Sequence, residues 1–306
     1  MSPLYLFAII AAVCPVSAAP AIDFTVPEPE KPAHVMRVMP QTADSRPLSP
    51  ETEQQLHHGL LERCRLMLPP QRVQPRLVRR GNEVHLHLYT PLKTPPGVSS
   101  EHLLQLYLNR VPNTCFLGIH PQTETLLRRP DIRDIIARYE QAVTTWMEGP
   151  RCTPPPRPAE LPPADDTAGY MLAEYPGRDR SGQYGYDYLI IRQPEVARAE
   201  ALLVTNRDVV SCTISSDDPR FLDVRLSPEA SERFRALTRS LAAAGGSLAL
   251  VSDGSVLCHL RMNEELSGSF KLKHTELQNL RAALLPPMPY RVNMESVLTK
   301  EGKTPY

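Results

Sequence analysis

The residues best suited to chemistry in this sequence are two histidines that alternate with apolar residues. His85 and His87 stand two apart in the segment 84–88, and residues two apart in a strand share one face. Two imidazoles on one face could ligate a transition metal. The alternative is a solvent-facing pair on a half-buried strand, which we favour because no Cys-x-x-Cys and no Cys/His cluster accompanies them. We therefore expect no metal site.

Other groups that could act in catalysis lack partners. Asp165-Asp166 and Asp217-Asp218 are adjacent carboxylates in loops, where nothing drives their pKa values apart. His57-His58 has no acidic or cysteine partner nearby in the sequence, and no Gly-x-Ser-x-Gly, phosphate-binding glycine loop or His-Glu-x-x-His occurs. We expect a protein that is not an enzyme and carries no cofactor. A secreted hydrolase stays as an alternative, because triad residues need not be close in sequence.

Aromatic residues supply the candidate binding contacts. Tyr184, Tyr186 and Tyr188 flank Gly185, and tyrosine rings can present an adhesive surface to a peptide. Ordinary alternation in a strand explains them equally well. Phe270 is a fourth candidate contact, although packing in a core is the interpretation that we favour for it.

The overall composition limits the class of partner. The chain has 34 basic and 34 acidic residues and a net charge of zero, whereas a nucleic-acid-binding domain is clearly basic. The arginine-rich segment 63–80 is an exception that could face anionic lipid or another protein. A solvated face of a helix and strand is the simpler explanation. Because the 33 prolines are clustered, they indicate stiff connecting segments.

The N-terminus resembles an export signal. An apolar run, 4–14, precedes the small residues of 16–19, which predicts a signal peptide at 1–19 cut after Ala18 or Ala19. Two alternatives stay open: an uncleaved anchor in the inner membrane formed by 3–22, and a lipoprotein with its lipid on Cys14. We expect a periplasmic or secreted protein that contacts a membrane only through an uncleaved N-terminus.

Cleavage of the signal would leave an odd number of cysteines, namely Cys64, Cys115, Cys152, Cys212 and Cys258. An odd number leaves at least one thiol unpaired. Bridges between Cys64 and Cys115 and between Cys212 and Cys258 would stay within one domain, and buried free thiols are equally compatible with the sequence.

The pattern of elements predicts an α+β fold with two small sheet-plus-helix domains. In the first half we expect helices over 49–68, 100–108 and 131–147 and strands over 73–79, 83–89 and 113–120. In the second half we expect strands over 170–175, 186–192, 209–214, 221–226, 248–252 and 256–261, with helices over 227–244 and 275–284. Asp253-Gly254 between apolar runs indicates a hairpin, because both turn residues need positive φ.

The predicted domain division follows the prolines. A Pro-rich tether, 20–47, precedes a base-like α+β domain, 48–150. A Pro-rich linker, 151–168, leads to a head domain, 169–295, and a tail, 296–306. The linker is either a hinge or a stiff spacer, and the sequence does not decide between them.

One ordered set of features resembles a known family. A strand leads to a helix carrying Phe234 and Thr238, then to an apolar strand ending in Asp253-Gly254. A further strand, the step Ser267-Gly268-Ser269-Phe270, a helix and a Pro-rich run after Leu284 follow. Over about seventy residues this order resembles the head of the large periplasmic domain of SecD, a protein translocase subunit.

The resemblance extends faintly upstream. The segment 60–88, with Arg63, Arg65 and Gly81, is similar to the base of the SecD domain, in which an arginine-bearing helix leads into two strands around a glycine turn. The sequence departs from the family at Tyr89-Thr90-Pro91 and in the proline insert 152–163. It also lacks the channel helices that follow in SecD, so we expect no proton-driven work by this chain alone.

The resemblance implies binding. A SecD-like periplasmic domain would catch unfolded or translocating polypeptide, and a Sec-type membrane complex is a further partner that the resemblance implies. Our leading hypothesis is therefore a periplasmic polypeptide-binding or protein-export accessory protein. The alternative is a secreted cell-envelope interaction module that kept the fold without a translocation role. Under either hypothesis Asp253, Gly254, Gly268 and Phe270 are structural family-motif positions.

Overall fold

The computed structural model describes residues 31–42, 48–68, 74–94, 97–149, 156, 160–162, 164–178, 184–273 and 277–297. The predicted signal peptide, most of the tether, Cys152 and the tail from 298 lie outside the described residues. The described elements combine helices with antiparallel-rich sheets, which confirms the α+β class. Within the described ranges no helix is both long and apolar enough to cross a bilayer.

A first group of elements, which we call the base, is built on a four-stranded antiparallel sheet. The strand order is β13 (Val292–Ser296), β1 (His34–Pro40), β3 (Glu83–Leu88) and β2 (Arg76–Arg80). Helices α1 (Pro50–Met67) and α2 (Ser100–Leu108) complete the base. Alternation of side chains along the strands puts Met36, Leu86 and Leu88 into one core with both helices.

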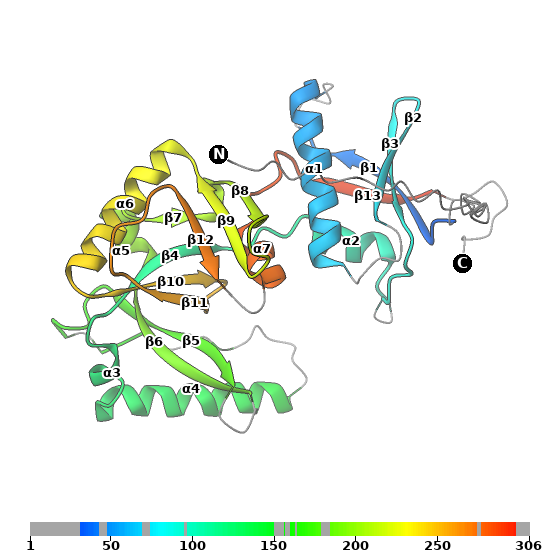
Figure 1. Cartoon of the computed structure of the whole chain (residues 1–306). Helices are drawn as coiled ribbons and strands as arrows, with labels where there is room; N and C mark the ends of the chain where they lie inside the picture. The colour runs from blue at the N-terminus through cyan, green and yellow to red at the C-terminus, as the bar shows by residue number, and fades with distance from the viewer. Residues whose placement is uncertain are drawn as a thin grey trace, which may run out of the picture. The chain divides into compact units, whose positions relative to one another are not determined.

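Helix α1 begins where the sequence predicts. The Ser49 side chain accepts a hydrogen bond from the Thr52 N–H, Pro50 occupies the first turn, and acidic residues follow beside the positive end of the helix dipole. Leu56, Leu60 and Cys64 then face the base core. In Figure 1, α1 and α2 lie with β1, β3 and β13.

The second group, the head, holds two sheets. The larger contains β4 (Thr114–Ile119), β5 (Tyr170–Arg178), β6 (Tyr184–Arg192), β7 (Val204–Thr205), β10 (Ser247–Ser252) and β11 (Ser255–Arg261). The smaller contains β12 (Ser269–Lys273), β9 (Phe221–Leu226) and β8 (Val209–Ile214). The helices are α3 (Thr123–Leu126), α4 (Pro130–Glu148), α5 (Pro194–Ala199), η1 (Asn206–Asp208), α6 (Pro228–Ala243) and α7 (Leu277–Leu284).

Three phenylalanines join the two sheets and α6. Phe116 of β4 meets Phe234 of α6 edge to face at 5.2 Å between ring centroids and Phe270 of β12 at 5.8 Å. Phe234 and Phe270 stack at 4.7 Å. Such pairs add about 0.5–1.5 kcal/mol each beyond the area that they bury. This cluster fixes the smaller sheet against β4 and β10.

The division into base and head differs from the predicted one. Strand β4 falls within the predicted base domain, 48–150, but it pairs along its whole length with β10 of the head. Helix α4 likewise shares a core with β5 and β6 through Ile132, Ile135 and Ile190. The Pro-rich segment 151–168 therefore connects two elements of the head, α4 and β5, and does not lie at the boundary between the two groups of elements.

The base is closed by strands from both ends of the described chain. Strand β1 lies inside the predicted tether, 20–47, where the prolines of the segment hid the alternation of Val35, Met36 and Val38. It pairs with β3 on one side and with β13 on the other. The chain therefore passes between base and head twice, at 109–113 and at 285–291 (Figure 1).

Side chains tie the two crossings together. The Asn109 side chain donates to the Val292 carbonyl at 2.7 Å and accepts from the Val292 N–H at 2.8 Å. Asp253, at the tip of the β10–β11 hairpin, accepts from the Asn113 N–H at 3.1 Å and from Arg110 at 2.8 Å. The hairpin tip thus anchors the first crossing.

The predicted exposure of the histidine pair is wrong. His85 is 3 % exposed and His87 is 8 % exposed. Their strand, β3, lies between β1 and β2 in the base sheet, so each imidazole has cross-strand neighbours on its own face, Val35 beside His87 and Val78 beside His85. His85 also contacts the Glu83 carboxylate at 3.0 Å.

Of the two alternatives for the cysteines, the described ones follow the buried free thiols, and neither of the two possible bridges is present among them. Cys64, Cys115, Cys212 and Cys258 are free and buried. Cys64 lies in the base core and Cys115 in the core between β4 and β6, so their thiols belong to different cores. Cys212 and Cys258 share the core of the head as ordinary apolar packing residues.

Candidate functional site

A groove of about 630 Å³ opens in the head where the ribbon formed by β5 and β6 leaves the rest of the larger sheet. Its lining is mostly apolar and aromatic. The lining side chains are Ile119, Leu127, Ile136, Tyr175, Tyr188 and Leu189, with Thr123, Glu124, Asp187, Ser247 and His259 at polar positions. Concave apolar surfaces with few polar groups are the common form of binding sites.

The groove continues a buried layer of the head. Ile119, Tyr175 and Leu189 line the groove and also pack in the core that contains Ala173, Ile191, Ala249 and Val251. These residues come from β4, β5, β6 and β10, whose alternate side chains point into the same space. The groove is therefore the open end of a core, and an apolar ligand there would extend that core.

Tyr175 and His259 face each other at the groove. Tyr175 lies on β5 and His259 on β11, and their rings meet edge to face at 5.1 Å between centroids. Burial is the main cause that raises the pKa of Tyr175 above its usual 10.0. The phenol is therefore neutral at physiological pH and acts as a polar rim group rather than as a charge.

Tyr188 is held on the ribbon by contacts with α4. Its hydroxyl donates to Glu140 at 3.1 Å, and its ring meets that of Tyr139 edge to face at 6.4 Å. The ribbon lies over α4 in Figure 1. Of the tyrosines predicted to contact a partner, Tyr188 lines the groove, while the side chains of Tyr184 and Tyr186 lie outside the described part of the molecule.

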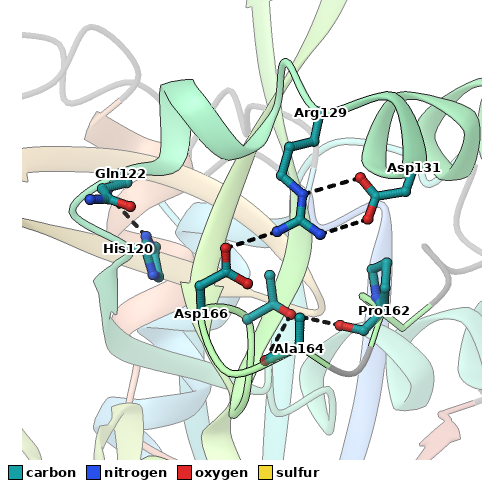
Figure 2. A network of polar contacts seen from close by, with 8 residues as sticks. His120, Gln122, Arg129, Asp131, Pro162, Ala164 and Asp166 are labelled. Atoms are coloured by element: carbon teal, nitrogen blue, oxygen red, sulfur yellow. Dashed lines mark hydrogen bonds and ion pairs between the residues drawn. The ribbon is translucent and has the colours of Figure 1, made fainter.

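An arginine secures the segment beside α4. Arg129 binds the Asp131 carboxylate at 2.7 Å and Asp166 at 2.8 Å (Figure 2). Thr167 continues the attachment by donating to the Pro162 carbonyl at 2.6 Å. The hydrogen bond from Arg129 is the main cause that lowers the pKa of Asp131. These contacts fix the end of the Pro-rich segment against the start of α4, which supports the wall of the groove.

His120 follows the last residue of β4 and faces the same network. Its Nδ1 accepts a hydrogen bond from the Gln122 N–H at 3.0 Å (Figure 2), and its ring contacts Tyr170 at 4.6 Å. Burial lowers the pKa of His120 below its usual 6.5. A neutral imidazole that accepts from the backbone has a structural role, namely to shape the turn between β4 and α3.

The family-motif positions lie away from the groove. Asp253 and Gly254 form the β10–β11 turn with φ of 51° and 90°. Gly268 packs so closely on α6 that a Cβ there would lie 1.8 Å from the Ser231 hydroxyl oxygen. Phe270 is 9 % exposed within the phenylalanine cluster, so its ring is a core group and does not form a surface for a partner.

Sequence reasoning missed most of the groove. Ile119, Leu127 and Ile136 were assigned to the other domain, because the strand and helices that carry them precede the Pro-rich segment. His259 alternates with apolar residues in 256–261, which was the one available signal that it projects from a strand. The arrangement offers apolar contacts with a few hydrogen-bonding groups. Among the described residues no three histidines, cysteines or carboxylates gather where they could hold a metal ion.

Comparison with known proteins gives a structural similarity only. No known sequence family and no curated protein sequence matches the chain. A structure of SecDF, described as a membrane component that enhances protein export, aligns at 14 % identity with a TM-score of 0.32, covering 87 % of this chain and 99 % of that one.

Two further SecDF structures align with the chain. SecDF in a super-membrane-facing form aligns at 14 % identity with a TM-score of 0.34, covering 87 % of this chain and 31 % of that one. The translocon-associated SecDF of Thermus thermophilus aligns at 14 % identity with a TM-score of 0.26, covering 87 % and 30 %. Similarity at this level assigns no function, which has to be argued from the residues.

Proposed function

We propose that this protein is a non-catalytic, periplasmic polypeptide-binding protein that assists protein export, and that it holds apolar segments of unfolded chains in the groove of the head. The observation that carries the proposal is the groove itself, which is the open end of a buried apolar layer and has Tyr175 and Tyr188 at its rim. Apolar segments are exposed in unfolded chains and hidden in folded ones, so such a surface selects the unfolded state.

The SecD-like order of motifs in the sequence supports the same proposal. The export-type N-terminus and the neutral charge balance are compatible with a periplasmic partner made of polypeptide. Burial of an apolar segment stabilises a complex by about 25 cal/mol per Å² of apolar surface, less the cost of ordering the segment. Binding in the micromolar range would suit a protein that must release its substrate.

The test is a titration of residues 20–306 with a reduced and carboxymethylated protein that cannot refold, followed by calorimetry. The same protein in its native, disulfide-bonded form is the folded control. We expect saturable binding of the unfolded form alone. Absence of binding at high micromolar concentration would remove the polypeptide-binding function.

Variants locate the site. Leu127→Glu and Ile136→Glu place a charge among apolar groove residues that are only partly buried in the free protein, and each should weaken binding at least tenfold. Val210→Glu is the matched control, because Val210 is an apolar residue of β8, 54 % exposed, outside the groove. Equal loss of binding in the control variant would show that the groove is not the site.

A second candidate is an envelope interaction module that binds through the base. It rests on three exposed apolar residues close together in the sequence, in α2 and just after it, namely Leu106 at 58 %, Tyr107 at 41 % and Val111 at 43 % exposure. Isolated apolar residues are common on surfaces, but contiguous ones mark interaction sites. Leu106→Ser should then abolish capture of an envelope partner and leave the binding of unfolded protein unchanged.

A further inference from the structure

The larger sheet of the head is closed into a ring by two very short contacts. Strand β4 pairs with β10, β10 with β11, and β5 with β6 over most of their lengths. By contrast β11 meets β5 at a single pair, Ser255 with Glu174, and β4 meets β6 at a single pair, Ile119 with Ile191. The β5–β6 ribbon is therefore joined to the rest of the sheet at only two residue pairs. Beyond the pair of Ser255 with Glu174, β5 and β11 are not paired.

The separation leaves one edge of β11 open. Among the described residues, 256–261 pairs with β10 on one side and has no registered partner on the other after Ser255. His259 of this stretch lines the groove together with Tyr175 of β5. The open edge therefore borders the groove and offers it backbone N–H and C=O groups.

Pro176 of β5 lies just beyond the point where the pairing with β11 ends. It lies two residues after Glu174, so in the strand it belongs to the same edge as Glu174. Proline has no N–H and is accommodated in strands where its nitrogen faces away from the ladder. Pro176 therefore cannot donate a backbone hydrogen bond to either neighbouring strand, and the registered pairing of β5 with β11 does not extend past Glu174.

We infer that an extended polypeptide segment binds by adding a strand to the open edge of β11, with its alternate side chains entering the groove. This inference rests on the proposed function and specifies its mode. The open stretch 257–261 is about 16 Å long at about 3.3 Å per residue, which accommodates a strand of about five residues. In strand addition the main-chain hydrogen bonds give affinity whatever the sequence of the added segment. Its alternate side chains, which enter the groove, decide which sequences bind best.

The occupant is therefore an extended segment with apolar residues at every second position. One set of its side chains would meet Ile119, Tyr175 and Leu189 in the groove. Its backbone would meet the edge of β11. A helical apolar segment presents no free backbone groups and would bind less well.

The test uses synthetic peptides of about nine residues in which valine alternates with threonine, and measures their affinity for residues 20–306 by fluorescence anisotropy. Successive N–H groups of a strand point to opposite edges, so two N-methylated versions block either the odd or the even donors. One methylated peptide should bind at least tenfold more weakly than the parent, and the other should bind like the parent.

Three outcomes separate the inference from the function on which it rests. Loss with one methylated set alone supports strand addition. Unchanged affinity of both methylated peptides, with the parent bound, overturns strand addition and leaves polypeptide binding by side chains. No binding of the parent or of the unfolded protein overturns the proposed function itself.

Hydrogen exchange gives an independent readout. In the free protein, the amides within 257–261 that do not bond to β10 should exchange rapidly, and the bound parent peptide should protect them at least tenfold. Protection confined to α3 and α4, with none on β11, would contradict strand addition.

Discussion

Glu62 of α1 and Arg281 of α7 form an ion pair that joins the base to the head. Both side chains are largely buried, at 8 % and 18 % exposure. Arg281 also donates from Nε to the Cys212 carbonyl of β8 at 3.2 Å, and Glu62 also binds Arg65 at 2.7 Å. The Arg281 guanidinium therefore links a backbone carbonyl of β8 in the head to the Glu62 carboxylate of the base.

Removal of one partner of this pair should cost stability. Glu62→Gln leaves the buried Arg281 charge without its carboxylate, so the free energy of unfolding should fall by about 3 kcal/mol. Glu232→Gln is the control, because it breaks a pair with Arg235 in which Glu232 is 71 % exposed, and such pairs contribute about 0–1 kcal/mol. Urea unfolding followed by circular dichroism measures both. A loss no larger than that of the control would show that the pair contributes little.

Gly268 should not tolerate a side chain. In Gly268→Ala the new Cβ would lie 2.4 Å from the Ser231 Cβ, and the displacement of α6 should lower stability by about 1–3 kcal/mol. Ser231→Gly removes the obstructing atoms, so the double variant should recover most of the loss relative to Ser231→Gly alone. If Gly268→Ala is equally destabilising in both backgrounds, the contact with Ser231 is not the cause.

Features that depend on residues close together in the sequence could be predicted. The helix at 50–67 follows from Ser49-Pro50-Glu51 and the hairpin of β10 and β11 from Asp253-Gly254, since caps and turns depend on neighbouring residues alone. Helix α2 begins and ends at the predicted residues for the same reason. The α+β class followed from the mixture of these patterns.

Partners distant in the chain could not be predicted in this way. The six residues of β4 are all buried, and a buried strand carries no signal of which strand it will pair with. The segment was therefore assigned to the base, and the groove that Ile119 lines was missed. His85 alternates like a solvent-facing residue, but its exposure depends on what lies over β3, which the strand itself does not encode.

Stability should depend on pH through three histidines. Burial lowers the pKa of His34, His87 and His120 below the usual 6.5. The unfolded chain therefore takes up protons at a higher pH than the folded one, and stability should fall as the pH falls below about 6.5. Unfolding in urea at pH 7.5 and at pH 5.5 measures the loss, in a range that lies above the ordinary pKa values of carboxyl groups.

Single substitutions assign this pH dependence. His87→Gln should reduce the difference in stability between the two pH values, whereas His58→Gln, on the exposed side of α1, is the control substitution. A histidine that is ion-paired in the folded protein would have the opposite effect, because its protonation would raise the free energy of unfolding at low pH. A protein that is more stable at pH 5.5 than at pH 7.5 would contradict the prediction.

The buried thiols should be unreactive in the folded protein. Burial raises the pKa of Cys64, Cys115 and Cys212 to about 12 and that of Cys258 to about 11. Only the thiolate reacts readily, so a thiol reagent at pH 8 should modify these residues only after unfolding in guanidinium. Mass spectrometry of a variant with Cys14 and Cys152 replaced by serine measures this. Modification of the native protein within minutes would show that a core opens.

The two crossings between base and head set an order of assembly. Strand β1 leaves the ribosome early, but its neighbour β13 is separated from it by the entire head. Until β13 arrives, one edge of β1 has no partner and can pair with another chain. The head can complete its cores before that moment, whereas the base cannot. A chain that ends before residue 292 would therefore contain every element of the head, but its base sheet would lack β13.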